Sequence, residues 1–381
     1  MSNPAQVSSQ PRFQYIDALR GWAMLLVLFG HCAGMAKIDG WLRTFADGCM
    51  MGVNLFFVIS AYTIFYMFSK HSQVESQPVR NFMIRRFFRI APLYWFAIGY
   101  YNVIWDWLPE SKHWHYFLNF FFLHALNPET HTSVVPGGWT ISIEMIFYLL
   151  VPLLFPFIRS FNRAWIFMLV AVFVFPLITF LISLGMNPLF ADVLPYQVAV
   201  YWERFPLVTI GIFAFGIVLF YFIKEERKAA LIRNKTFNVI NLLIIGIALS
   251  ALAFMTVHFP LKSHFYGALF MLLALMLSAH PWKVLVNPVT VFLGRISYSM
   301  YIFHFAVITW LYKWIPAQFP NLMEHGYPYF FVYFVFGLLF TVPLGLCGYQ
   351  FIEKPAIRCS QMLVSYLENN PRKDRADLKA G

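Results

Sequence analysis

Charged residues are scarce in this sequence. Only 12% of its 381 residues are Asp, Glu, Lys or Arg, whereas 60% are hydrophobic and 20% are aromatic. A soluble fold carries about twice that share of charge, because its outside must be hydrated. The scarcity therefore excludes an ordinary soluble protein and predicts an integral membrane protein with the lipid bilayer as its solvent.

Cysteine is also rare, and its four positions are scattered: Cys32, Cys49, Cys347 and Cys359. They are too few and too far apart for a disulfide framework or a metal cluster, so we interpret them as small packing residues. The sequence also has no heptad run, no repeat of 20–50 residues and no visible inverted repeat of the kind many transporters show. The first apolar run ends without a small-x-small cleavage pattern, so we do not expect a signal peptide.

Long apolar segments are what the sequence has in quantity. Ten approach the ~20 residues that a spanning helix needs, at 16–36, 50–69, 88–108, 139–158, 164–184, 205–223, 237–257, 264–280, 289–315 and 328–352. Residues 115–126 are too short to span, so we expect a re-entrant or interfacial helix there. The prediction is an all-α polytopic protein with a transmembrane domain at 14–358, a short segment at 1–13 before it, and a largely disordered tail at 359–381.

The distribution of basic residues predicts the orientation. With the N-terminus inside, the outer segments hold only Lys37, Arg43, Lys112, Arg204, Lys262 and Lys313, so 22 of the 28 Lys and Arg lie on the cytoplasmic side. Cytoplasmic loops are enriched in this way, and both termini are therefore expected in the cytoplasm. The net charge of +11 then reflects membrane orientation, and no nucleic-acid partner is expected.

Arg20 and His31 stand out because they lie inside the first apolar segment. Polar groups at membrane depth are costly, so they are functional candidates by default. Eleven residues separate them, which is about three helical turns plus 20°, so both should project from one face roughly 16 Å apart. This spacing predicts a charge near one membrane surface and a titratable base near the middle of the bilayer.

Arg86 and Arg89 lie one helical turn apart at the cytoplasmic start of the third segment. Orienting charge alone explains one or two basic residues there. Two guanidinium groups in this register would also form a clamp for phosphate oxygens, which arginine binds bidentately. Both interpretations remain open from the residues alone.

Two further polar residues lie within apolar segments. Glu144 is either a structural ion-pair partner, of Arg20 or Arg43, or a group that orients a substrate. His304 is interpreted as a residue that hydrogen-bonds between helices, the commoner role for a lone intramembrane histidine. The external histidines His113, His115, His124 and His131 suggest a metal, but they lack the accompanying Cys or carboxylate ligands, so no metal is expected.

A series of motifs follows in chain order: Ile16–Gly21 with His31, Gly52–Ala61, Arg86–Pro92, Trp139–Tyr148, Ile296–His304 and Phe351–Pro355. Together they resemble the acyltransferase-3 family of membrane enzymes, which O-acylate carbohydrates and other hydroxylated acceptors. The resemblance runs from Tyr15 to Arg358. Asn54 departs from it, since an acidic residue is frequent at that position, and Ala61 stands where Gly is usual.

The resemblance implies a stand-alone O-acyltransferase in the bacterial inner (cytoplasmic) membrane. It implies His31 as the catalytic base, Arg20 and Glu144 as further catalytic-site residues, and Arg86 and Arg89 as the binding residues for cytoplasmic acyl-CoA. Acetyl-CoA is the favoured donor, and a carbohydrate or glycolipid is the expected acceptor. The rival hypotheses are a proton-coupled secondary transporter using His31, Glu144 and His304, and a scaffolding membrane protein, which would leave Arg20 and His31 unexplained.

Overall fold

The computed structural model describes residues 11–105, 110–225, 232–256, 261–320 and 326–369, and within these ranges it contains helices and no strands. This confirms the all-α prediction. Each predicted span overlaps one long helix: α1 (Pro11–Met35), α3 (Gly52–His71), α4 (Pro78–Trp105), α6 (Trp139–Phe157), α7 (Phe161–Met186), α9 (Pro206–Lys224), α11 (Lys235–Phe254), α12 (Lys262–Ala279), α14 (Ser297–Gln318) and α15 (Tyr327–Gly348).

Not all ten helices are equally suited to cross a bilayer. By length and composition, the described residues contain eight sufficiently apolar helices, or nine if a bent pair counts as one span. The exception is α4, which is long enough at 28 residues but has Arg80, Arg85, Arg86 and Arg89 in its first half. The multi-pass architecture is thus clear, while the count of ten spans stays a prediction.

The bent pair corrects one expected span. Residues 289–315 were predicted to form a single helix, but α13 (Pro288–Arg295) and α14 meet at an angle of 78°. The short α13 packs closely across α1. A Cβ on Gly21 would overlap the carbonyl oxygen of Thr290, and a Cβ on Gly294 would overlap that of Asp17. Small residues allow such a close crossing of two backbones.

The remaining elements are short. They are α2 (Gly40–Cys49), η1 (Glu110–Lys112), α5 (Trp114–Phe120), η2 (His124–Leu126), η3 (Asn187–Phe190), α8 (Pro195–Glu203) and the π-helical turn η6 (Tyr349–Glu353) before α16 (Lys354–Asn369). The brevity of α5 and η2 confirms that 115–126 does not span. Disorder was expected from residue 359, but α16 continues to Asn369 and buries Ser360 and Val364. Residues 1–10 and 370–381 lie outside the described residues.

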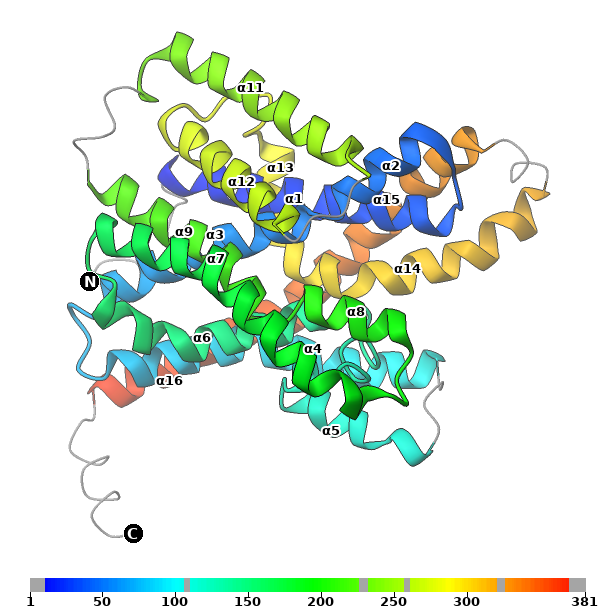
Figure 1. Ribbon diagram of the computed structural model, residues 1–381, viewed down its shortest axis with the longest axis horizontal. Coiled ribbons are helices and arrows are strands. Elements are labelled where there is room, and N and C mark those ends of the chain that lie inside the picture. Colours follow the sequence, from blue (N-terminus) through cyan, green and yellow to red (C-terminus); the bar gives the residue numbers. More distant parts are fainter. Residues whose placement is uncertain (1–10, 106–109, 226–231, 257–260, 321–325, 370–381) are drawn as a thin grey trace.

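Helix α1 lies in the interior of the bundle (Figure 1), where it contacts α2, α3, α12, α13, α14 and α15. Ala18, Ala23, Met24, Val27 and Leu28 are fully buried along it. Helices α7 and α11, by contrast, expose most of their large apolar side chains, as helices facing lipid do. The helix that carries Arg20 and His31 is therefore surrounded by other helices.

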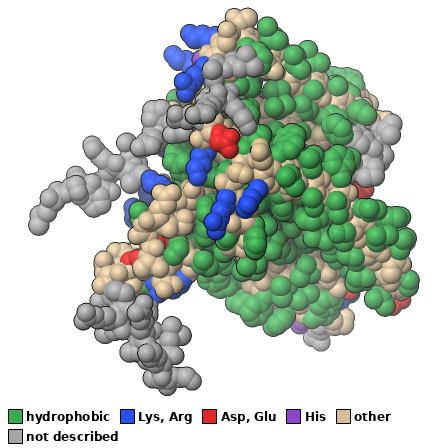
Figure 2. Space-filling view, turned by 60° about the vertical axis from the view of Figure 1, so that its left-hand side comes forward, with side chains coloured by type: hydrophobic (Ala, Val, Ile, Leu, Met, Phe, Trp, Pro, Cys, Tyr) green, Lys and Arg blue, Asp and Glu red, His purple; other side chains and the backbone are tan. Residues whose placement is uncertain are grey.

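Basic side chains gather at one end of the molecule. The start of α1 and helix α16 lie at the left of Figure 1, whereas α2, α5 and α8 lie towards the right. Figure 2, which turns the left side forward, shows Lys and Arg side chains gathered there beside a broad hydrophobic surface. The start of the first described helix and the last described helix thus lie towards the same end of the molecule, and which side is cytoplasmic stays a prediction. Arg227, Lys228 and the basic tail residues used in that prediction lie outside the described residues.

Candidate active site

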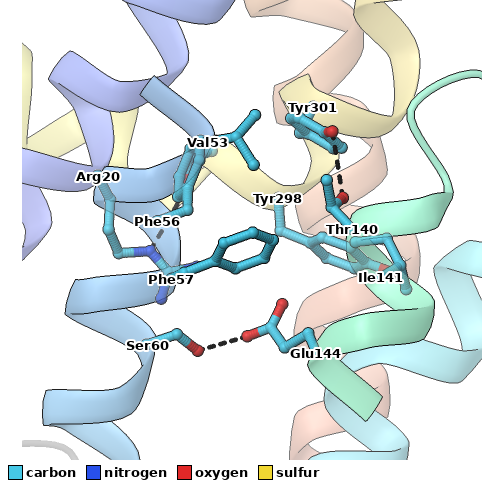
Figure 3. Close-up of a pocket in the computed structure, with 11 residues that line it drawn as sticks. Arg20, Val53, Phe56, Phe57, Ser60, Thr140, Ile141, Glu144, Tyr298 and Tyr301 are labelled. Atoms are coloured by element: carbon cyan, nitrogen blue, oxygen red, sulfur yellow. Dashed lines mark hydrogen bonds between the residues drawn. The ribbon is translucent and has the colours of Figure 1, made fainter. Parts of the chain in front are cut away.

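Arg20 and Glu144 line one internal cavity. Its wall is formed by α1, α3, α6 and α14, and its residues are drawn in Figure 3. The Nε of Arg20 donates a hydrogen bond to Ser297 Oγ at 3.4 Å, and Arg20 has no carboxylate within ion-pair distance among the described residues. Most of the N–H groups of its guanidinium are therefore available to a ligand in the cavity.

Glu144 is held by hydroxyl groups. Its Oε1 accepts hydrogen bonds from Ser60 Oγ at 2.5 Å and from Tyr148 OH at 2.6 Å. Ser60 belongs to α3 and Tyr148 to the next turn of α6, so two helices fix the carboxylate. The suggested ion pair with Arg43 is wrong, because Arg43 pairs with Asp47 at 2.9 Å on α2. Glu144 and Arg20 face the same cavity without a direct ion pair.

A second, smaller cavity extends the first towards the predicted cytoplasmic end. Arg20 and Glu144 line it together with Arg86 and Arg89 from α4. The register predicted for the two α4 arginines is therefore confirmed, and it brings them close to Arg20. Three guanidinium groups around one cavity form a strongly anion-attracting environment.

The two α4 arginines differ in their partners. Arg89 forms an ion pair with Glu353 of η6, whose side chain is 0% exposed. Arg86 has no carboxylate partner among the described residues, and its Nε is buried without a hydrogen bond. It lies 5.6 Å from the centre of the Phe82 ring. Of the two α4 arginines, Arg86 is therefore the one that can accept an anionic ligand without losing an ion pair found among the described residues.

His31 opens into a third cavity, of about 350 Å³, towards the other end of the bundle. This outer cavity and the Arg20 cavity share three wall residues, Val53, Phe57 and Tyr301. The prediction that Arg20 and His31 face the same way is thus confirmed, since their cavities adjoin. His31 lies about one turn before the end of α1, and its expected depth near the middle of the bilayer stays a prediction.

His304 lies beside His31, which the sequence did not indicate. The two rings are 5.3 Å apart between centroids. The Nδ1 of His304 is 2.6 Å from the carbonyl oxygen of Tyr301, and because a carbonyl only accepts, Nδ1 must carry the proton. The Nε2 of His304 is then an acceptor, and it is buried without a partner. The lone histidine is thus one of a pair from α1 and α14.

The external histidines lie in the segment between α4 and α6. Burial lowers the pKa of His124 to about 4, and burial together with the nearby Arg204 lowers that of His131 to about 3. Both are therefore neutral near pH 7. His124 Nε2 lies 3.1 Å from Tyr94 OH, and His131 stacks on Trp139. Among the described residues no three His, Cys, Asp or Glu side chains lie close enough to hold a metal.

Comparison with known proteins identifies the family of this chain. The family described as an acyltransferase domain, of the acyltransferase-3 type, matches residues 13–346. This chain belongs to the acyltransferase-3 family. The matched region contains the motifs from Ile16 to His304 that carried the resemblance. All five residues expected at the active site lie within the matched region.

Two relatives from Staphylococcus aureus are also similar. One is a provisionally named O-acetyltransferase of strain COL, and the other is the O-acetyltransferase OatA of strain NCTC 8325. Each is 26% identical over 383 residues, which cover 89% of this chain and 56% of the relative. The chain thus spans little more than half of their length. No solved structure shows significant similarity.

Proposed function

We propose that this chain is an O-acyltransferase of the bacterial cytoplasmic membrane. It transfers an acetyl group from acetyl-CoA, bound at the cytoplasmic side, to a hydroxyl of a glycan or glycolipid. The observation that carries the proposal is the row of adjoining cavities, with unpaired Arg86 and Arg20 at one end and His31 at the other. The family match and the two O-acetyltransferase relatives support the reaction class.

The donor binds through its phosphates at the arginine end. Coenzyme A carries several phosphate charges, and guanidinium groups bind them through paired hydrogen bonds. Arg86 contributes most, since Arg89 is already paired with Glu353. Arg20 lies between this end and the reaction centre, and Glu144, anchored by Ser60 and Tyr148, keeps a negative charge beside it.

His31 acts as the general base. It takes the proton of the acceptor hydroxyl while that oxygen attacks the thioester carbonyl, and the carbon–sulfur bond then breaks. The proton passes from His31 to the departing thiolate, so the products are the acyl ester and free coenzyme A. His304 positions the base: its unpartnered Nε2 can accept the N–H of His31, which leaves the other His31 nitrogen free for the substrate.

The shared wall between the cavities favours a small acyl group. Val53 and Phe57 line both cavities, and Phe57 is packed against Phe213 at 4.7 Å between ring centroids. The Arg20 cavity itself holds only about 50 Å³. An acetyl group needs little movement of these side chains, whereas a longer chain needs them displaced from a packed environment.

The test is transfer of radiolabel from acetyl-CoA to bacterial surface glycans by purified wild-type and His31→Ala proteins. Loss of the base should reduce the rate by about 10²–10⁴. His71→Ala is the matched control, because His71 lies at the end of α3 and lines none of these three cavities. Near-wild-type transfer by well-folded His31→Ala protein would refute the assignment. Glycan flux into proteoliposomes without label transfer would favour the transporter instead.

A further inference from the structure

Arg204 places a positive charge in the outer cavity and forms no ion pair among the described residues. Arg204 follows the last residue of α8 and lines this cavity together with His31. Its guanidinium lies 4.7 Å from the centre of the Trp139 ring. Among the described residues, no carboxylate lies within ion-pair distance of Arg204 and its side chain forms no hydrogen bond. The neighbouring Glu203 is exposed on the same wall but does not pair with it.

An unpaired guanidinium in a cavity is costly unless something binds it. Stacking on Trp139 offsets part of the cost and fixes the position of the charge. Trp139 is itself held by contacts with the rings of His131 and Phe57. The cation is therefore presented on a rigid support, which is the arrangement a binding group needs.

Apart from His31 and the exposed Glu203, the other polar groups of the cavity are neutral hydrogen-bonding groups. Asn54 donates to the backbone carbonyl of Ser263 at 3.0 Å, which leaves its side-chain oxygen available, and Thr132 and Thr209 add hydroxyls to the wall. Asn54 lines the same cavity as Arg204 but is an amide, so it contributes no negative charge there. The cavity thus combines one cation with groups suited to sugar hydroxyls.

We propose that Arg204 binds an anionic group of the acceptor, a carboxylate or a phosphate, and so restricts the enzyme to acidic glycans or glycolipids. This inference rests on the proposed function. The anion is held at Arg204 while a hydroxyl of the same sugar reaches His31. The alternative role for a cation at this position is to stabilise the developing oxyanion of the transition state. Loss of oxyanion stabilisation lowers the transfer rate for every acceptor, whereas loss of anion recognition lowers it only for charged acceptors.

The test compares three small acceptors that share ring hydroxyls at C2, C3 and C4: methyl β-xyloside, methyl β-glucuronoside and methyl β-glucoside 6-phosphate. Transfer from labelled acetyl-CoA is measured as kcat/KM for each. Wild type should favour at least one charged acceptor over the xyloside by about ten- to a hundredfold, the scale of a charge-assisted hydrogen bond. Which charged acceptor it favours identifies the anionic group.

Substitutions test whether the preference for charged acceptors depends on Arg204. Arg204→Gln should remove it while leaving transfer to the xyloside within about twofold, and Arg204→Lys should keep part of it because the charge remains without the bidentate fork. Asn54→Asp should also weaken it by placing a carboxylate in the cavity. Arg43→Gln is the matched control, since Arg43 is also an outer arginine but is paired with Asp47. Folding of each variant is established when the detergent-solubilised protein elutes from a size-exclusion column at the same volume as wild type.

Several results would overturn the proposal. Equal use of all three acceptors by wild type shows that no anion is recognised. An equal loss on all three in folded Arg204→Gln protein assigns Arg204 to the transition state. Hydrolysis of acetyl-CoA with no transfer to any of the three refutes this acceptor class, whereas no turnover of acetyl-CoA at all refutes the proposed function and this inference with it.

Discussion

The ion pair between Arg89 and Glu353 connects two distant parts of the chain at the arginine end of the cavities. Glu353 is completely buried, and its second carboxylate oxygen accepts a hydrogen bond from Ser299 Oγ at 2.9 Å. Breaking a buried pair by removing one partner leaves an uncompensated charge and typically costs about 3–5 kcal/mol. We therefore expect Arg89→Ala to lose about that much of its free energy of unfolding.

Arg86→Ala should behave differently although the two arginines are one turn apart. Arg86 has no carboxylate partner among the described residues, and its guanidinium lies 5.6 and 5.8 Å from the centres of the Phe82 and Tyr148 rings. Such contacts contribute about 1 kcal/mol. The stability loss should be small, and the main effect should be a raised KM for acetyl-CoA.

The assay is unfolding in detergent micelles, followed by donor kinetics of the folded fraction. A double variant, Arg89→Met with Glu353→Met, removes both charges at similar volume and should recover most of the stability lost in Arg89→Ala. If Arg89→Ala and Arg86→Ala prove equally stable, the ion pair does not stabilise the fold and the argument fails. If the stable double variant also keeps wild-type donor affinity, the role of Arg89 is structural.

Three further outcomes are expected. Burial holds His124 and His131 neutral in the folded protein, with pKa values of about 4 and about 3, so below the ordinary histidine pKa of 6.5 the unfolded chain binds more protons than the folded one. The free energy of unfolding should therefore be constant above pH 7 and fall as the pH drops from 6.5 towards 4, by about 3 kcal/mol for His124 alone. Thermal unfolding that does not change with pH across that range would contradict this. Val53→Ala should raise the use of butyryl-CoA relative to acetyl-CoA by about tenfold, and an unchanged ratio would exclude the shared wall as the size filter. With the exposed native cysteines replaced, Ser111→Cys should be labelled on intact cells and Arg233→Cys only after permeabilisation; labelling of both from one side would overturn the predicted orientation.

The helices were predictable because each spanning segment has to be long and apolar. The bounds of α6 and α9 differ from the predicted spans by no more than one residue at each end. The bend at Ile296 was not predictable from hydropathy, since residues 289–315 average as one apolar run. It depends on the contact of Gly294 with Asp17, and a single sequence does not record which distant segments meet. Arg295 inside that run was the one local clue.

In the candidate site, too, features within one helix were predictable from the sequence, whereas contacts between distant segments were not. Helical periodicity placed Arg20 and His31 on one face, because both belong to one helix. The partners of each residue come from elsewhere: His304 reaches His31 from α14, and Glu353 reaches Arg89 from η6. The incorrect pairing of Arg43 was avoidable, since Asp47 lies four residues later and such pairs meet on a helix.

The order of the cavities bears on the choice between an enzyme and a transporter. A transporter must pass its whole cargo, so its pathway has to open wide at every point in turn. Here the cavities adjoin at Val53, Phe57 and Tyr301, and Tyr301 is tied to Thr140 Oγ1 at 3.1 Å. On the proposed function only the acyl group crosses this point, while coenzyme A stays on the arginine side and the acceptor stays beside His31. A tight wall between two binding cavities is therefore an obstacle to transport but an advantage for transfer, because it keeps donor and acceptor apart except where they react.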